Sequence, residues 1–262
     1  MTKVIWHISK YTRTPDKDFF GNRGWDLMKN FALKGYKSVV ITSDSLPNYN
    51  LLKLNCRYKK FYEDDVCVII VKTLQYANPK SIKRVLSWFS FEWNLFCLNK
   101  KNLPKPDVII VSSLSLLTIV NGIYLKKRFK SKLVFEIRDI WPLSIVENSS
   151  LSWSNPFVIF LKFIEYWGYK KSDILVGTMP NLKEHVDNIL GFSKDVSCIP
   201  IGFNKNEIIK SRKIDKKIAV KIPDYKFIVG YFGGIGISNA LNSFFDSIEI
   251  LDKNNNKIHF II

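Results

Sequence analysis

The chain has 262 residues, of which 47% are hydrophobic and 14% aromatic, so it is long and apolar enough to fold around its own core. Its formal net charge of +17 favours an anionic partner: a nucleic acid, a lipid surface or a phosphorylated substrate. Zinc-finger spacings, RNA-binding aromatic signatures and an isolated basic tail are absent from the sequence, so we expect no nucleic-acid partner. No segment reaches the roughly 18 apolar residues of a membrane span, and the first residues resemble a strand rather than a signal peptide. We therefore expect a cytoplasmic protein with peripheral membrane contact at most.

Apolar runs in chain order predict strands, and segments with apolar residues at helical spacing predict helices between them. We expect strands at 4–8, 37–42, 66–71, 107–112, 133–137, 173–178 and 196–199. We expect helices at 25–34, 79–100, 113–129, 155–171 and 180–190. The stretch 43–62 is polar and is expected to be irregular. Continuous apolar strands that alternate with helices indicate an α/β fold with a doubly wound parallel sheet.

A second domain is predicted to begin near residue 226. The charged stretch 207–225 resembles a linker, and the alternation then restarts with a strand at 226–232. A glycine loop, Gly233-Gly234-Ile235-Gly236, leads into a helix at 239–251, and a further strand starts at 257. One such unit cannot bury its own faces. We therefore expect residues 1–206 to form an N-terminal domain and 226–262 to be the incomplete start of another.

The segment KLVFEIRDIWP, residues 132–142, contains the first candidate site. Its buried strand ends in Arg138, Asp139 and Trp141, and Pro142 stops it. Ligands of open parallel sheets bind just beyond the carboxyl ends of the strands, so these side chains are candidate site residues. The alternative is a capped strand in which Arg138 and Asp139 form a local ion pair.

A second candidate site is the loop FFGNRG, residues 19–24, between the first strand and the first helix. Free backbone N–H groups at a helix start bind phosphate or other anions. The glycines Gly21 and Gly24 do not form the GxGxxG pattern of dinucleotide-binding proteins. The alternative is a tight turn into a helix.

Four segments together resemble the family 4 retaining glycosyltransferases of the GT-B fold. They are FFGNRG at 19–24, FEIRDIWP at 135–142, IPIGFN at 199–204 and VGYFGGIGISNAL at 229–241. The resemblance is closest to bacterial O-antigen and capsule enzymes, including those similar to L-fucosamine transferases. It implies that an N-terminal acceptor domain and a C-terminal donor domain transfer a sugar from a nucleotide-sugar, most often a UDP-sugar, with retention at the anomeric carbon.

The chain departs from the family pattern in three places. Arg138 stands where many members have a histidine, and Ile201 and Asn204 replace the usual asparagine and aspartate. The sequence also stops before the region in which the family carries its basic donor-phosphate residues and its E-x7-E motif. The resemblance therefore implies a truncated donor domain.

The resemblance also implies roles for particular residues. Arg138 and Asp139 would be the catalytic pair facing the sugar or the acceptor; Arg138 would bind an anionic group, and Asp139 would orient a hydroxyl or hold Arg138. Two loops would bind the donor phosphates through backbone N–H groups and one guanidinium. Their residues are Gly21, Arg23, Gly24, Gly233, Gly234 and Gly236. The nucleotide-sugar is a substrate, so no cofactor is expected.

Metal binding and membrane contact are the two remaining predictions about partners. Asp16-Lys17-Asp18 matches the DxD pattern of metal-dependent glycosyltransferases of another fold, but loop aspartates are usually solvated turn residues, and we expect no metal. The positive charge fits a lipid-linked glycan acceptor at an anionic membrane surface. The aromatic helix 79–100 is the candidate contact, and the alternative is that it packs on the sheet.

Three functions compete on the sequence alone. The first is a glycosyltransferase of bacterial surface polysaccharide synthesis, peripheral at the inner face of the cell membrane. The second is a non-catalytic acceptor- or membrane-binding half that needs a separate donor-domain chain. The third is a nucleotide-sugar epimerase or dehydrogenase, which requires an early GxGxxG loop that the sequence lacks, although Tyr166 and Lys170 have the Tyr-x-x-x-Lys spacing.

Overall fold

The computed structural model describes residues 2–15, 22–45, 54–78, 81–148, 151–202, 216–220, 222–223, 226–235, 239–254 and 257–262. The chain divides into two compact units, Met1–Phe203 (unit 1) and Asn204–Ile262 (unit 2). The prediction of domains at 1–206 and 226–262 stays a prediction, and each unit is described by itself.

Unit 1 is built on an eight-stranded sheet of order β3-β4-β2-β1-β5-β6-β7-β8. The strands are β1 (Val4–Ile8), β2 (Lys37–Ser43), β3 (Tyr58–Glu63), β4 (Val66–Val71), β5 (Val108–Ser112), β6 (Lys132–Ile137), β7 (Ile174–Gly177) and β8 (Val196–Cys198). All neighbouring pairs are parallel except β3 and β4. The strand order reverses at β1, which pairs with both β2 and β5, so the carboxyl end of β1 is the switch point where such sheets bind ligands.

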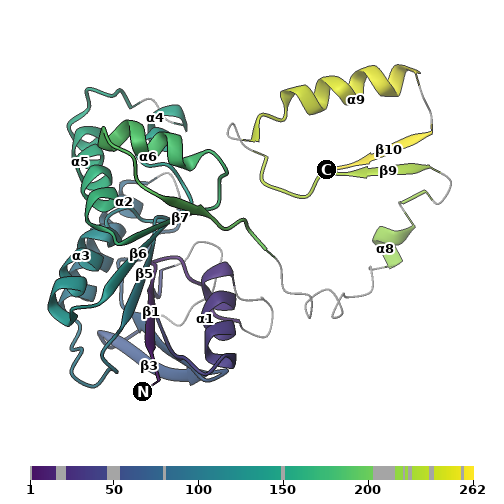
Figure 1. Ribbon diagram of the computed structural model, residues 1–262. Helices are drawn as coiled ribbons and strands as arrows, with labels where there is room; N and C mark the ends of the chain where they lie inside the picture. The colour runs from purple at the N-terminus through teal and green to yellow at the C-terminus, as the bar shows by residue number, and fades with distance from the viewer. Residues whose placement is uncertain are drawn as a thin grey trace. The chain divides into compact units, whose positions relative to one another are not determined.

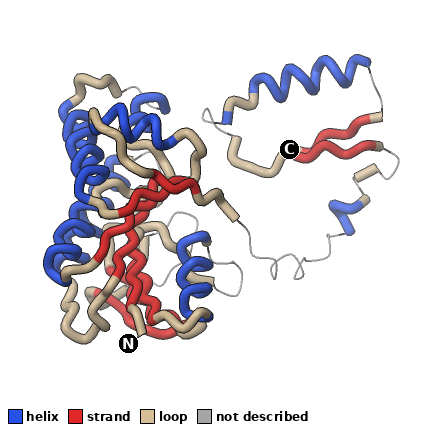
Figure 2. Tube along the Cα trace, in the orientation of Figure 1, coloured by secondary structure: helices blue, strands red, loops and turns tan. Residues whose placement is uncertain are grey.

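Helices cover both faces of this sheet. They are α1 (Arg23–Leu33), α2 (Ile82–Cys97), α3 (Thr118–Phe129), α4 (Leu143–Asn148), α5 (Pro156–Lys171) and α6 (Leu182–Leu190). Figure 1 shows α1 on one side of the strands and α2, α3 and α5 on the other, and Figure 2 shows the sheet in red between them. The parallel, doubly wound architecture predicted from the sequence is confirmed.

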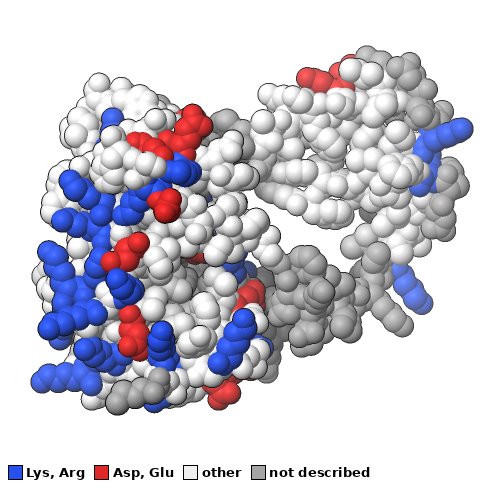
Figure 3. Space-filling view, viewed as in Figure 1, with Lys and Arg blue, Asp and Glu red and all other residues white. Residues whose placement is uncertain are grey.

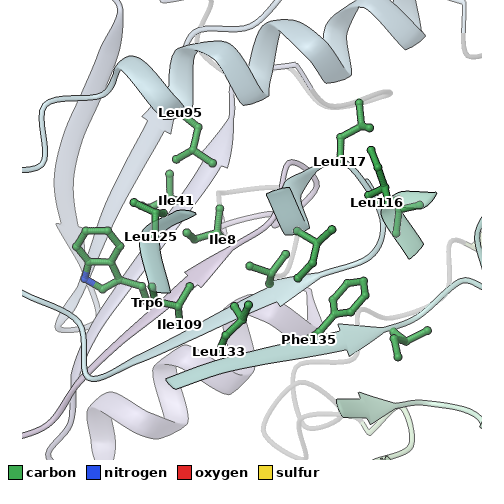
Figure 4. Close-up of a cluster of buried hydrophobic side chains, with 14 of the residues drawn as sticks. Trp6, Ile8, Ile41, Leu95, Ile109, Leu116, Leu117, Leu125, Leu133 and Phe135 are labelled. Atoms are coloured by element: carbon green, nitrogen blue, oxygen red, sulfur yellow. The ribbon is translucent and has the colours of Figure 1, made fainter. Parts of the chain in front are cut away.

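Two hydrophobic clusters fill the space between the sheet and the helices. Trp6 and Ile8 of β1 belong to the larger cluster, with side chains of α2, α3 and α5, whereas Ile5 packs with Trp25 and Met28 of α1. Figure 4 shows part of the larger cluster. Successive residues of β1 therefore point to opposite clusters, which explains why the buried strands are continuously apolar.

Local sequence signals account for the start of α5. Pro156 is its first residue, where the missing N–H of proline costs nothing, and the side chain of Asn155 accepts a hydrogen bond of 2.9 Å from the N–H of Phe157. The helix then runs to Lys171, as predicted.

Several predicted boundaries were wrong. The stretch 43–62 contains the edge strand β3, which pairs antiparallel with β4. A turn at Asp64 and Asp65 joins the two strands, and both residues have positive φ, as a tight hairpin requires. Helix α3 begins at Thr118, not at residue 113, and the short α4 was not predicted. Pro79 lies outside the described residues, and α2 begins at Ile82.

Unit 2 contains the short helix α8 (Lys216–Ala219) within the predicted linker, β9 (Phe227–Gly230), α9 (Asn242–Asn254) and β10 (Ile258–Ile261). β9 and β10 are parallel neighbours, with Phe227 opposite Ile258. A parallel pair joined by a helix is the unit from which doubly wound sheets are built. Among the described residues, no helix is long and apolar enough to cross a membrane.

Candidate functional site

Arg23 and Glu136 form a buried ion pair beside the carboxyl end of β6. Arg23 is the first residue of α1, and its Nε lies 2.8 Å from Oε1 of Glu136. Its other two nitrogens donate hydrogen bonds of 2.7 and 3.0 Å to the carbonyls of Pro200 and Ile199, which follow β8. Burial by itself would raise the pKa of Glu136, but His7 and Arg23 outweigh it and hold that pKa below its ordinary value.

His7 lies on β1, next to this pair. Its side chain is buried; Nδ1 shares a hydrogen bond of 3.3 Å with Oγ1 of Thr12, and Nε2 has no partner within the described part of the chain. Burial lowers the pKa of His7 to about 4, aided by the positive charges of Arg138 and Arg23 and opposed by Glu136. At neutral pH, His7 is therefore an uncharged imidazole.

Gly24 allows the start of α1 to lie directly against His7. A Cβ atom at this position would come within 2.6 Å of Cε1 of His7 and 2.9 Å of Oγ1 of Thr12. Close packing thus explains this glycine without a ligand. Donor-phosphate binding by Arg23 and Gly24 stays a prediction, and Gly21 lies outside the described residues.

Arg138 and Asp139 follow β6 in a turn that Ser113 fixes. The N–H of Arg138 donates to Oγ of Ser113 at 2.9 Å, and this hydroxyl donates to the carbonyl of Asp139 at 3.3 Å. Within the described chain, no salt bridge joins Arg138 to Asp139, and the buried Nε of Arg138 has no hydrogen-bond partner. Desolvation raises the pKa of Asp139, although Arg138 and Arg84 oppose it. A guanidinium nitrogen without a partner can bind an anionic or carbonyl oxygen.

Trp141 completes the strand end predicted from the sequence. It is buried, and its ring packs edge-on against Trp88 of α2 with the ring centroids 5.1 Å apart. The Trp141–Pro142 peptide bond is cis. Trp141 therefore connects the turn after β6 to α2.

The sequence reading missed Lys10, which lies two residues beyond β1. It is buried, and its Nζ donates to the carbonyl of Ser45 at 3.0 Å. The same Nζ lies 4.5 and 5.2 Å from the ring centroids of Tyr11 and Tyr76. Burial lowers its pKa to about 7, as does the charge of Arg84. The sequence feature that could have identified Lys10 is its position directly after a predicted buried strand.

These groups place cations and aromatic rings at the carboxyl edge of the central strands. Lys10 follows β1, Arg138 follows β6, and Arg84 belongs to α2, while His7 of β1 is an uncharged imidazole beside them. Arg84 lies over Trp88, 5.5 Å from the ring centroid. Such an arrangement is suited to a polar ligand that carries negative charge.

A cavity of about 500 Å³ lies on the sheet face next to the Arg23–Glu136 pair. Its other walls are mainly apolar, including Ile110 and Val134 of the central strands and Ile199. The cavity therefore offers a mainly nonpolar surface, with charged side chains from the Arg23–Glu136 pair and from Lys3.

The glycine loop of unit 2 is only partly described. The carbonyl of Gly234 accepts hydrogen bonds from Oη of Tyr231, at 3.0 Å, and from the side chain of Asn239. A Cβ atom on Gly233 would lie 2.7 Å from the Tyr231 hydroxyl. Gly236 lies outside the described residues, and donor-phosphate binding by this loop stays a prediction.

No group of metal-ligating side chains occurs among the residues that the structure describes. Asp16 and Asp18 lie outside them. The acidic hairpin next to β3 has Asp64 paired with Lys29 at 2.6 Å.

No family model and no curated protein matches this sequence. Solved structures do match. A structure of trehalose-6-phosphate from E. coli bound with UDP-2-fluoro glucose has a TM-score of 0.59 at 13% identity, over 98% of this chain and 64% of that one. The apo structure of OtsA has a TM-score of 0.57 at 13% sequence identity, and the match covers 99% of this chain and 64% of that one. The structure of Anabaena HepE in complex with UDP and glucose has a TM-score of 0.51 at 11% identity, and the match covers 98% of this chain and 68% of that one.

These matches establish the fold, which is the GT-B fold with Rossmann-like domains. The chain spans 64% of the length of the first two structures. The fold class predicted from the sequence is confirmed.

Proposed function

We propose that this chain is a glycosyltransferase, or the acceptor-side part of one, that uses a nucleotide-sugar as donor. The observation that carries the proposal is the shared fold: two structures with it, at TM-scores above 0.5, hold UDP-2-fluoro glucose or UDP with glucose. A UDP-sugar is therefore the donor that we propose. The cations at the carboxyl edge of unit 1 support a substrate with negative charge.

The proposed chemistry assigns separate tasks to the two units. When the sugar leaves the donor, negative charge develops on the diphosphate oxygens, and the backbone N–H groups of Gly233 and Gly234 would stabilise it. Arg138, whose buried Nε has no partner, would bind an oxygen of the sugar or of an anionic acceptor. Asp139 would orient the acceptor hydroxyl. We propose retention at the anomeric carbon, as in the family 4 enzymes that the sequence resembles.

The proposed acceptor is a lipid-linked glycan at the inner face of the cell membrane, in bacterial surface polysaccharide synthesis of the O-antigen or capsule type. A formal charge of +17 supports an acceptor that carries phosphate and lies at an anionic surface.

Calorimetric titration of the protein purified from the cells that produce it tests donor binding. We expect UDP and a UDP-sugar to bind, and NAD to show no heat of binding, because the first loop lacks the GxGxxG pattern. The Arg138→Gln variant should bind UDP as the wild type does and should lose about tenfold or more in kcat/KM, since a charge-assisted hydrogen bond is removed. Lys105→Gln, a change at an exposed lysine, is the matched control. Binding of NAD without binding of UDP would contradict the proposal.

A further inference from the structure

Helices α2, α3 and α5 expose apolar side chains on their outward faces. α2 buries Trp88, Phe91 and Leu95 against the sheet. Its opposite side carries five large apolar residues that are 43–79% exposed: Ile82, Leu86, Phe89, Trp93 and Phe96. The outward side of a helix in a soluble protein is normally polar.

α5 repeats this pattern. It buries Leu161 and Ile164 and exposes four large apolar residues, each by 40–59%: Ile159, Phe160, Phe163 and Trp167. Spacings of three and four residues place them on one side of the helix. Helical spacing alone does not separate the two sides of this helix, because both carry apolar residues.

Contacts between the helices join these surfaces. On α3, Val120 and Tyr124 are exposed, and the ring of Tyr124 lies 5.0 Å from that of Phe96 on α2. At the other side of α3, Nζ of Lys126 donates to the carbonyl of Lys171 at the end of α5. The eleven exposed apolar residues of α2, α3 and α5 are called the helical face below.

The exposed charged side chains on α2, α3 and α5 themselves are all positive, and an exposed aspartate, Asp173, follows α5 and pairs with Lys126 of α3. Each of α2 and α5 contains one acidic residue, and both are turned inward: Glu92 accepts hydrogen bonds from Thr118 and Asn121 of α3, and Glu165 is 1% exposed. α3 contains no acidic residue. The exposed cations on these helices are Lys83, Lys127, Arg128, Lys162, Lys170 and Lys171. Figure 3 shows Lys and Arg gathered where Figure 1 draws α3 and the lower part of α5.

Lysines and aromatic rings lie at the same level on α5. Nζ of Lys171 is 5.5 Å from the ring centroid of Trp167, and Nζ of Lys170 is 5.1 Å from that of Tyr166. Aromatic rings flanked by lysines are typical of surfaces that lie at the headgroup level of a bilayer. A group of exposed large apolar side chains marks an interaction site, and the excess of exposed cations over acidic side chains on these helices favours an anionic partner.

We propose that the helical face binds the surface of an anionic lipid bilayer, with its apolar residues at the headgroup boundary and its lysines and Arg128 on lipid phosphates. This deepens the proposed function, on which it rests for the lipid-linked acceptor, by naming the surface that meets the membrane. The expected contact at 79–100 is thereby extended, because α2 supplies only part of the face.

Co-sedimentation with vesicles tests the proposal without any sugar donor, so its failure is distinct from a failure of glycosyl transfer. At low salt, the protein should bind vesicles of phosphatidylcholine with phosphatidylglycerol about tenfold or more tightly than vesicles of phosphatidylcholine alone, and high salt should weaken this binding. The fluorescence of exposed Trp93 and Trp167 should shift to the blue on binding.

Two variants alter the helical face at exposed positions, so that folding is retained: Phe163→Ser with Trp167→Ser, and Lys127→Glu with Lys170→Glu. Each should lose about tenfold or more of the vesicle binding. The matched control, Tyr62→Ser with Lys59→Glu, makes the same kinds of change on the edge strand β3 and should bind as the wild type does.

Three outcomes would overturn the proposal. The wild type would fail to sediment with anionic vesicles, or both face variants would sediment as well as the control. The third is a wild type that self-associates and ignores vesicles while the Phe163→Ser, Trp167→Ser variant is monomeric, which would make the helical face a protein interface.

Discussion

The buried imidazole of His7 predicts an acid-sensitive fold. Its pKa is about 4 in the folded protein, against 6.5 for the ordinary group, so the unfolded chain takes up a proton first as the pH falls. The contribution of neutral His7 to the free energy of unfolding is fully present above pH 6.5 and is lost as the pH falls to 4. This loss amounts to about 3 kcal/mol. Urea denaturation of the wild type and of His7→Gln over this range should show the free energy of unfolding of the wild type falling more steeply. Parallel pH dependences would contradict a neutral, buried His7.

The Arg23–Glu136 ion pair should be costly to break from one side. Arg23→Gln leaves the buried carboxylate of Glu136 without its cation, and we expect the free energy of unfolding to fall by about 3–5 kcal/mol. Lys29→Gln is the matched control, because Lys29 lies on the same helix but forms an exposed pair with Asp64. The free energy of unfolding of this control variant should fall by less than about 1 kcal/mol. Equal losses of unfolding free energy in the two variants would mean that the buried ion pair stabilises the fold no more than the exposed one.

Gly24 should tolerate no side chain where α1 meets β1. The added methyl group of Gly24→Ala would clash with His7 and Thr12, and we expect a loss of about 1–3 kcal/mol in the free energy of unfolding. Gly202→Ala, at a position where nothing lies within 4 Å of the new Cβ, should change it by less than about 0.5 kcal/mol. Thermal denaturation of both variants measures the difference. A stable Gly24→Ala protein would show that α1 moves freely against β1.

Helices α2 and α3 are joined through Glu92. Its Oε1 accepts from Oγ1 of Thr118 and its Oε2 from Nδ2 of Asn121, both at 2.6 Å. Burial raises the pKa of Glu92 to about 7, although these hydrogen bonds and Lys10 oppose it.

This raised pKa predicts the opposite pH dependence to that of His7. The folded protein keeps a proton on Glu92 up to about pH 7, whereas the unfolded chain loses it near pH 4.5, so the stability contribution falls as the pH rises between these values. As the pH rises from 4.5 to 8, the free energy of unfolding of Glu92→Gln should therefore increase by up to about 3 kcal/mol relative to that of the wild type. Calorimetric melting of both proteins at the two pH values measures this gain. A difference that stays constant with pH would show that Glu92 titrates normally.

The sequence predicts the parallel strands well because both of their faces are buried, which leaves continuous apolar runs such as 66–71. It misses β3 because Tyr58–Glu63 is a polar edge strand whose partner, β4, supplies the reason for its extended shape. For α2 the sequence left two alternatives open, membrane contact or packing on the sheet, and for α5 it did not separate the exposed side from the buried one. An exposed aromatic residue and one that faces the core look alike in the sequence of a helix such as 156–171.

In the candidate site, too, the sequence predicts what is local in the chain and misses contacts between distant residues. Arg138 and Asp139 were found because they directly follow a buried strand. The pairing of Arg23 with Glu136 joins residues 113 positions apart in the chain, and no local pattern in the sequence contains it. Lys10 became a site residue only when its neighbours from α2 and from the segment that follows β2 were known.

Across the whole chain, the order of elements agrees with a GT-B protein. An eight-stranded doubly wound unit comes first, and a parallel pair of strands joined by a helix follows in unit 2. The likeness to solved structures extends over both units, since it covers 98% of the chain. The membrane-binding surface that we propose lies on helices of unit 1, and the candidate site lies at the carboxyl edge of its strands.

The most direct test of the account is transfer of sugar from a UDP-sugar by the protein purified from the cells that produce it. A panel of UDP-sugars is supplied with a lipid extract of the same cells, and both UDP release and the NMR spectrum of the product are followed. We expect UDP release that depends on the extract, and a product that retains the anomeric configuration of the donor. A folded protein that releases no more UDP than a heat-denatured sample, with every UDP-sugar of the panel, would contradict it.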